Sequence, residues 1–274
     1  MRCYAATERR DWRMLEVIDK GSATESRPVP LLFVHGAWHA AWCWDEHFLD
    51  FFAAQGYRAI AVSLRGHGKS SGGERLRWTR IRDYADDVAE TAAQLPTPPV
   101  LVAHSMGGFV VQQYLEHHGA AGAVLVAPIP PTGVLRLTLH VARHYPAAFL
   151  KANAELRLGP LLATPDLARA LLFSASMPDA QVDSYQRRVE DESYRAFLDM
   201  LALDLVRTKR VNRVPMLVLG AAHDAMVTQR EIHRTAAVYG AEAEIFPDMA
   251  HDMMLERGWQ AVAERIDSWL AAQL

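Results

Sequence analysis

Short apolar runs alternate with amphipathic stretches along most of this chain. The apolar runs have the length of buried strands, and between them apolar residues recur every three or four positions, as on a helix with one buried face. In the clearest helical stretch Ile81, Tyr84 and Val88 share one face with Ala92 and Leu95. Strands are expected at residues 13–19, 30–34, 57–64, 100–103, 123–127, 216–219 and 243–246, and helices at residues 42–54, 80–95 and 109–117 and after each of the last two strands. This alternation predicts an α/β fold with a mostly parallel sheet covered by helices on both faces.

One region, residues 129–214, has no strand pattern. Helical patterns occupy residues 134–144, 165–175, 180–189 and 193–206, with proline and glycine between them. We therefore expect an α/β core made of residues 1–128 and 215–274, with residues 129–214 inserted as an all-helical cap. Such an insertion would lie over the carboxyl ends of the strands, where open α/β sheets bind ligands. The alternative is a helical subdomain with a structural role alone.

Composition narrows the classes of protein further. The 274 residues are half apolar and carry a formal net charge of −3, which gives no basic surface for nucleic acid or an anionic membrane. No apolar run reaches 18 residues, and residues 1–14 lack the apolar segment of a secretion signal. Cys3 and Cys43 are expected to be free thiols. These features favour a soluble cytoplasmic protein without membrane insertion or a nucleic-acid partner.

The most informative segment runs from Pro99 to Gly108. Apolar residues suited to a buried strand lead into Ser105, and a helical pattern follows at once. This is the layout of a nucleophile elbow, a sharp strand-to-helix turn that exposes a serine hydroxyl. The crowded turn needs small residues two positions before and after the serine, and here these are Ala103 and Gly107. Ser105 is therefore the predicted nucleophile.

A serine nucleophile needs a base, and the base needs an acid that orients it. Asp224 follows the predicted strand 216–219, and His251 lies on a loop between the last predicted strand and the last helix. Loops after parallel strands meet at one edge of a sheet, and the chain order Ser, Asp, His is the one used by α/β-hydrolases. The sequence thus predicts that Ser105, His251 and Asp224 form a catalytic triad.

Other residues compete for these roles. His104 adjoins the nucleophile but points elsewhere on the elbow, so packing is its expected role. His223 is expected in the wall of the site, because the base comes last in the chain. Asp248 and Asp252 lie too near the predicted base in sequence to orient its ring, and Glu256 is expected to be solvated within the last helix.

A tetrahedral intermediate needs backbone donors for its oxyanion. One is expected to be the N–H of Met106, at the start of the helix after the nucleophile. The other is expected from Ala37, because Gly36 allows the loop after strand 30–34 to turn, with His35 supporting that loop. The histidines lack the spacing of metal ligands, and residues 66–70 lack the spacing of a P-loop. Neither a metal nor another cofactor is expected.

Several of these segments together resemble the α/β-hydrolase superfamily: 33–36, 65–70, 103–108, 220–224 and 250–251. Residues 35–44 are similar to the methylesterase and hydroxynitrile lyase branch and its bacterial relatives. The resemblance implies a cofactor-free Ser-His-Asp site beneath a helical cap. Hydroxynitrile lyases carry a lysine directly after the catalytic histidine, where this chain has Asp252, which disfavours lyase activity. Ser105 excludes the aspartate nucleophile of epoxide hydrolases and haloalkane dehalogenases.

The resulting hypothesis is a carboxylesterase that acts on a small to medium hydrophobic ester. Thioesterases, acyltransferases, amidases and cofactor-free perhydrolases use the same triad, and some relatives are small-molecule receptors, so these alternatives stay open, as do monomer and dimer. The substrate pocket is expected to be lined by Trp38, Phe109, Leu139, Phe149, Leu172 and Phe173.

Overall fold

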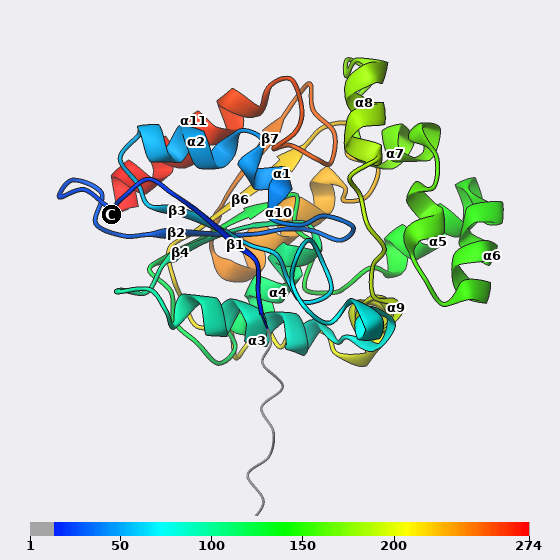
Figure 1. Ribbon diagram of the computed structural model, residues 1–274, viewed down its shortest axis with the longest axis horizontal. Coiled ribbons are helices and arrows are strands. Elements are labelled where there is room, and N and C mark those ends of the chain that lie inside the picture. The colour runs from blue at the N-terminus through cyan, green and yellow to red at the C-terminus, as the bar shows by residue number, and fades with distance from the viewer. Residues whose placement is uncertain (1–13, 274) are drawn as a thin grey trace, which may run out of the picture.

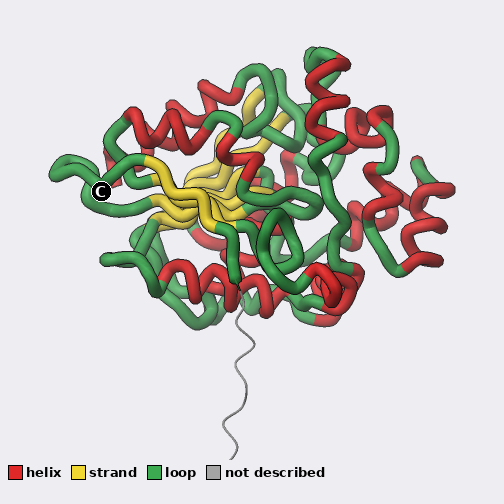
Figure 2. Tube along the Cα trace, in the orientation of Figure 1, coloured by secondary structure: helices red, strands yellow, loops and turns green. Residues whose placement is uncertain are grey.

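The computed structural model describes residues 14–273, and a seven-stranded sheet forms its centre. The strands lie in the order β1-β3-β2-β4-β5-β6-β7. Figure 2 shows the sheet in yellow among the helices and loops. Only β1 is antiparallel to its neighbour. Their bounds are β1 Val17–Lys20, β2 Leu31–Val34, β3 Ala59–Val62, β4 Val100–His104, β5 Gly122–Val126, β6 Met216–Ala221 and β7 Glu242–Phe246. Each strand predicted from the sequence is present, although Arg13 lies outside the described residues.

The burial of the strands explains their composition. Strands β2 to β6 are buried along their whole length, so both faces of each are apolar. The edge strands β1 and β7 are only partly buried and carry charged residues. Parallel strands covered on both faces need this continuous apolar content, whereas edge strands do not. Strand β4 therefore holds the elbow near the middle of a rigid sheet.

Helices cover the two faces of the sheet, as Figure 1 shows. Helices α2 and α11 lie on one face, and α3 and α4 pack together on the other. The predicted helix over residues 42–54 is two helices, α1 and α2, separated by a short turn. The core helices are α1 Trp42–Asp45, α2 Phe48–Ala54, α3 Ile81–Ala92, α4 Met106–Tyr114, α10 Gln229–Tyr239 and α11 Trp259–Gln273, with a 3₁₀ turn, η1, at Gly73–Trp78.

A helical segment connects β5 to β6 and lies beyond one end of the sheet (Figure 1). It contains α5 Leu135–His144, α6 Pro146–Glu155, η2 Gly159–Leu162, α7 Pro165–Leu172, α8 Asp179–Gln186, α9 Tyr194–Leu198 and a π-helical turn, η3, at Asp199–Leu203. Helix α6 was not predicted, and it begins directly at Pro146, whose fixed φ suits a first helical position. Between β5 and β6, which the structure describes in full, no residue belongs to a strand.

Two smaller expectations concern cysteine and membranes. Cys43 is buried with a free thiol, and Cys3 lies outside the described residues. In the described part of the chain, no helix has the length and apolar character needed to cross a bilayer.

Candidate active site

Ser105 occupies a strained turn between β4 and α4. Its φ of 51° and ψ of −118° lie where non-glycine residues are rarely found. The backbone holds the turn from both sides, because the amide of Ser105 donates to the carbonyl of Val126 (3.0 Å) and its carbonyl accepts from the amide of Ile129 (3.1 Å). These two hydrogen bonds hold the strained backbone in place, and Ser105 is among the residues that line a cavity.

Two glycines make this turn possible. A Cβ at Gly107 would lie 2.4 Å from the carbonyl oxygen of His35, and one at Gly108 would lie 2.7 Å from the Cβ of Pro128. The backbone of α4 therefore approaches the loop after β2 and the end of β5 more closely than any side chain allows. This confirms the steric reason for a small residue at position 107.

The structure joins Ser105, His251 and Asp224 in one chain of hydrogen bonds. His251 Nε2 lies 2.8 Å from Ser105 Oγ, and Nδ1 lies 2.8 Å from Asp224 Oδ2. A carboxylate only accepts hydrogen bonds, so Nδ1–H donates to Asp224 and Nε2 is free to accept from the Ser105 hydroxyl. Asp224 is fixed in turn by the amides of Met226 (2.7 Å) and Val227 (2.9 Å), which donate to Oδ1.

The three side chains are buried, and this shapes their charges. Burial alone would lower the pKa of His251, but the charge and hydrogen bond of Asp224, together with the charge of Asp252, raise it above its ordinary value. The protonated ring, which proton transfer from a hydroxyl would produce, is therefore stabilised. This arrangement suits a general base that must hold a proton for part of a reaction.

The predicted oxyanion-binding residues, Ala37 and Met106, both line the cavity beside Ser105. Neither amide donates a hydrogen bond to any group among residues 14–273. Met106 is the first residue of α4, where the helix dipole favours negative charge. Ala37 lies on the loop after β2, and Gly36 lets this loop approach the elbow, since a Cβ at position 36 would lie 3.0 Å from the Cβ of Ser105. The role of the two amides as oxyanion donors stays a prediction.

Two buried imidazoles hold the carbonyls of that loop. His35 Nδ1 lies 2.8 Å from the carbonyl of Gly36, and His39 Nδ1 lies 2.8 Å from that of Ala37. His35 Nε2 accepts from the amide of Leu64 (2.9 Å), so its ring is neutral, and burial lowers its pKa well below the ordinary value. His35 thus makes the supporting contact that its position suggested.

A cavity extends from Ser105 into the helical segment. Its surface is almost entirely apolar, because α5, α6 and α9 turn their apolar faces toward it. The core contributes Ala37, Trp38, Ser105, Met106, Ile129 and Met226, and the helical segment contributes Val134, Leu137, Thr138, Val141, Phe149, Ala152, Asn153, Leu158, Leu161, Leu171, Tyr194, Phe197 and Met200.

Two of the six predicted pocket residues, Trp38 and Phe149, line this cavity, and the other four do not. Leu139 is 62% exposed, because the inner face of α5 carries Leu137, Thr138 and Val141 instead. Phe109 is buried in the core beneath the elbow. Leu171 takes the inward position expected for its neighbour Leu172, and Phe173 stacks on Tyr185.

The competing candidates occupy other places. His223 and Asp248 are exposed and stand outside the hydrogen-bonded chain. His104 is buried; its Nε2 donates to the carbonyl of His251 (3.0 Å), and desolvation lowers its pKa to about 3. The expectation for Glu256 was wrong: it precedes α11, is buried, and accepts from the amide (2.5 Å) and hydroxyl (2.8 Å) of Ser174.

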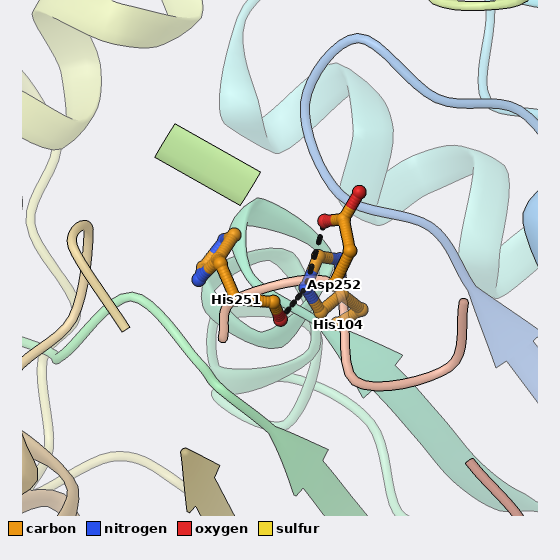
Figure 3. Close-up of side chains that lie close together, drawn as sticks. All are labelled: His104, His251 and Asp252. Carbon is orange, nitrogen blue, oxygen red and sulfur yellow. Dashed lines mark hydrogen bonds and ion pairs between the residues drawn. The ribbon is translucent and has the colours of Figure 1, made fainter. Parts of the chain in front are cut away.

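One group of side chains has the proximity of metal ligands. Ligand atoms of His104, His251 and Asp252 lie within 4.8 Å of one another, and Figure 3 shows these residues. Both nitrogens of His251 are already bonded to the triad partners, and Asp252 Oδ2 lies 3.1 Å from His39 Nε2. In this group, only His104 Nδ1 and the Asp252 carboxylate have no hydrogen-bond partner, and two residues fall short of the three or four ligands of a typical zinc site.

Sequence reasoning missed two buried pairs of histidine and carboxylate. His39 pairs with Asp252, and His67 pairs with Glu192 at 3.2 Å. The members of each pair lie more than a hundred residues apart in the sequence. His39 and His67 lie in segments 35–44 and 65–70, which carry the family resemblance, but no pattern marks Asp252 or Glu192 as their partners.

Comparison with known proteins identifies related sequences. The chain is 27% identical over 248 residues to a non-heme haloperoxidase from Rhodococcus erythropolis, a match that covers 82% of this chain and 86% of that protein. It is 35% identical over 116 residues to the bifunctional esterase/perhydrolase DCH of Acinetobacter calcoaceticus, where the match covers 38% of this chain and 39% of that protein.

Solved structures share the same fold. An esterase from Exiguobacterium antarcticum superposes with a TM-score of 0.71 at 20% identity, covering 94% of this chain and 96% of that one. A monoacylglycerol lipase from Paleococcus ferrophilus gives 0.72 at 21%, covering 95% and 100%. The model of the alpha/beta hydrolase family matches residues 31–265. With an elbow serine on a mostly parallel sheet, this chain belongs to the alpha/beta hydrolase family.

Proposed function

We propose that this protein is a serine carboxylesterase that hydrolyses a small to medium hydrophobic ester. One observation carries the proposal. Ser105 Oγ is linked to Asp224 by hydrogen bonds through His251, and Ser105 lines an almost entirely apolar cavity. A hydroxyl with a base at 2.8 Å is an activated nucleophile, and the apolar cavity beside it offers a place for the hydrocarbon part of a substrate.

The proposed reaction has two halves. Ser105 Oγ bonds to the acyl carbon while its proton passes to His251 Nε2, and the amides of Ala37 and Met106 bind the oxyanion. The alcohol leaves with that proton, and an acyl-enzyme remains. Water then attacks the acyl carbon, gives a proton to His251, and releases the acid as Ser105 regains its proton. Asp224 keeps the ring in the required tautomer and stabilises its charged form.

The apolar cavity supports a substrate without charge on its buried part. Burying apolar groups contributes about 25 cal/mol per Å² of surface, whereas an unpaired charge placed there is strongly disfavoured. We therefore expect the acyl or alcohol group to be a hydrocarbon chain or ring. In this proposal residues 129–214 act as a cap, because its helices supply most of the residues that line the cavity.

The test is hydrolysis of p-nitrophenyl esters from acetate to laurate by wild-type protein and by Ser105→Ala. Wild type is expected to show a chain-length optimum, and the variant is expected to lose turnover by about 10⁶-fold, as in other triads. Equal turnover by the two proteins would contradict the mechanism. A folded wild type that is labelled at Ser105 by a fluorophosphonate but turns over no ester would favour a receptor instead.

A second candidate is perhydrolysis at the same site. The names of two relatives, a haloperoxidase and a bifunctional esterase/perhydrolase, favour testing it. In that reaction hydrogen peroxide replaces water in the second half and leaves with the acyl group as a peracid. Peracid formation from acetate ester and peroxide, lost in Ser105→Ala, would support this candidate, and ester hydrolysis unaffected by peroxide would exclude it.

A further inference from the structure

A second pair of histidine and aspartate lies behind the proposed active site. His39 is 1% exposed and follows the loop that carries Ala37, and Asp252 is fully buried and directly follows His251. His39 Nε2 lies 3.1 Å from Asp252 Oδ2. The proposed reaction uses neither side chain. A buried ionisable pair is costly to desolvate, so its retention beside the site calls for an explanation.

The neighbours of His39 favour its charged form. Its Nδ1 lies 2.8 Å from the carbonyl of Ala37, which only accepts hydrogen bonds, so Nδ1 carries a proton. Its Nε2 has no hydrogen-bond partner and meets the carboxylate of Asp252 as an ion pair at 3.1 Å, an arrangement that suits a positively charged ring. In agreement, Asp252 outweighs the effect of burial and raises the pKa of His39, while His39 holds that of Asp252 below its ordinary value.

The pair connects the two loops whose relative position sets the reaction geometry. Through Nδ1, His39 holds the carbonyl of Ala37, the proposed oxyanion-binding residue. Asp252 is covalently joined to the base His251, and Figure 3 shows its carboxylate beside the His104 ring and away from the ring of His251. His104 adds a further link, because its Nε2 donates to the carbonyl of His251 at 3.0 Å.

Titratable groups surround the pair from several elements. Burial raises the pKa of the Cys43 thiol of α1 and lowers that of His35 after β2, and desolvation also raises that of Glu256. The groups that face the pair are therefore His35, Cys43, His104, His251 and Glu256. Both members of the pair act on His251 electrostatically: the charge of Asp252 raises the pKa of His251, and His251 in turn lowers that of His39.

We propose that His39 and Asp252 are positioning residues: their buried ion pair fixes the oxyanion loop against the loop of the base. The inference rests on the proposed function, because it assumes that Ala37 binds an oxyanion and His251 transfers protons. Its consequence is that the pair acts on the transition state and leaves the binding of the ground-state substrate unchanged.

The variants separate the two contacts of His39, its hydrogen bond to Ala37 and its ion pair with Asp252. Asp252→Asn removes the negative charge with little change in shape. His39→Gln places an amide near the position of Nε2, and His39→Asn places one near that of Nδ1, so each keeps one of the two contacts without a positive charge. The matched control is Glu192→Gln, which breaks the equally buried pair with His67 away from the triad.

We expect kcat to fall by about 10²-fold in Asp252→Asn and His39→Gln, with KM within about twofold of wild type, because a displacement of about 1 Å in an active site costs this much. Inhibition by an alkyl boronic acid, which mimics the tetrahedral state, is expected to weaken in parallel. Glu192→Gln should keep wild-type kcat and boronate affinity. Circular dichroism is used to check that each variant is folded. If His39→Gln does not fold, the same measurements are made on His39→Asn.

The pH profile of kcat/KM separates the two roles, because a pair that served packing alone would leave this profile unchanged when it is mutated. Asp252→Asn removes a charge that raises the pKa of His251, so the acid limb of kcat/KM should shift to lower pH. His39→Gln leaves Asp252 without its counterion, so that limb should shift to higher pH. The inference is overturned if the two midpoints stay at the wild-type value or move together, with kcat no lower than in Glu192→Gln. A wild type without Ser105-dependent turnover would instead overturn the proposed function.

Discussion

The surroundings of the buried histidines set the direction of their pKa shifts. Burial lowers the pKa of His35, which accepts from the amide of Leu64, and that of His104. In His39, His67 and His251 a carboxylate outweighs burial and raises the pKa. The histidines with a raised pKa are therefore the ones that pair with a buried carboxylate.

The charge of His251 leads to a prediction for the pH dependence of activity. The neutral ring is the active form, and its pKa is raised by Asp224, so kcat/KM should decline on the acid side with a midpoint above about 6.5. Asp224→Asn should move this midpoint down and lower kcat by about 10⁴-fold, as in a comparable triad. The profile of a p-nitrophenyl ester between about pH 5 and 9 is the measurement. A midpoint that Asp224→Asn leaves in place would show that another group controls the limb.

At this scale the sequence predicted the roles that depend on local motifs and chain order. Ser105 was found from the small residues around it, and Asp224 and His251 were found from their places after strands; their catalytic roles stay predictions. The pairing of His39 with Asp252 was beyond such reasoning, because it depends on two loops that meet only after the sheet has formed.

At the scale of helices and strands, the periodicity of the chain predicted where elements lie better than how they face. Helix α5 was expected, but its rotation was read wrongly, so Leu139 was placed in the pocket where Leu137 and Val141 lie. A helix turns about 100° per residue, and a cap helix has a cavity on one side and solvent on the other. In α5, Leu135 and Leu139 on the solvent side are as apolar as Leu137 and Val141 on the cavity side, so composition alone does not distinguish the two sides.

The facing of these helices can be tested through acyl-chain length. Phe149 of α6 lines the cavity, so Phe149→Ala should enlarge it and shift the preference toward longer p-nitrophenyl esters. Leu139→Ala is the matched control, because Leu139 points to solvent and should leave the optimum unchanged. Relative kcat/KM across the series from acetate to laurate is the measurement. A shift in the control alone would reverse our assignment of the two faces.

In the whole molecule, the helical segment is fastened to the core along its second half. Glu192 bonds to His67 and Tyr84, and the amide of Glu190 donates to the carbonyl of Trp38 at 2.8 Å. These contacts join segments that lie more than a hundred residues apart in the sequence. The alternation of strands and helices predicted the core and the insertion, but these polar contacts depend on packing that no local pattern records.

The pair of His67 and Glu192 makes this fastening sensitive to pH. Glu192 raises the pKa of His67 above its ordinary value of about 6.5, so the pair stabilises the fold fully below that pH and less as pH rises through the raised value. The melting temperature of Glu192→Gln should therefore lie furthest below that of wild type near pH 6 and approach it near about pH 9. Thermal unfolding followed by circular dichroism gives both curves. A difference that grows with pH would contradict the ion pair.

The loop that carries His251 and Asp252 is hydrogen-bonded to the helical segment as well as to the sheet. The amide of Asp252 donates to the carbonyl of Leu172 at 3.0 Å, and Glu256 accepts from Ser174. Residues 172–174 are thus part of the scaffold beneath His251, although they lie inside the insertion. Chimaeras that borrow a cap from another enzyme should therefore exchange the stretch from α5 to the start of α7 and retain Leu172 to Ser174. The boundary for recombination lies within residues 129–214, whereas the strand pattern places it at the ends of that segment.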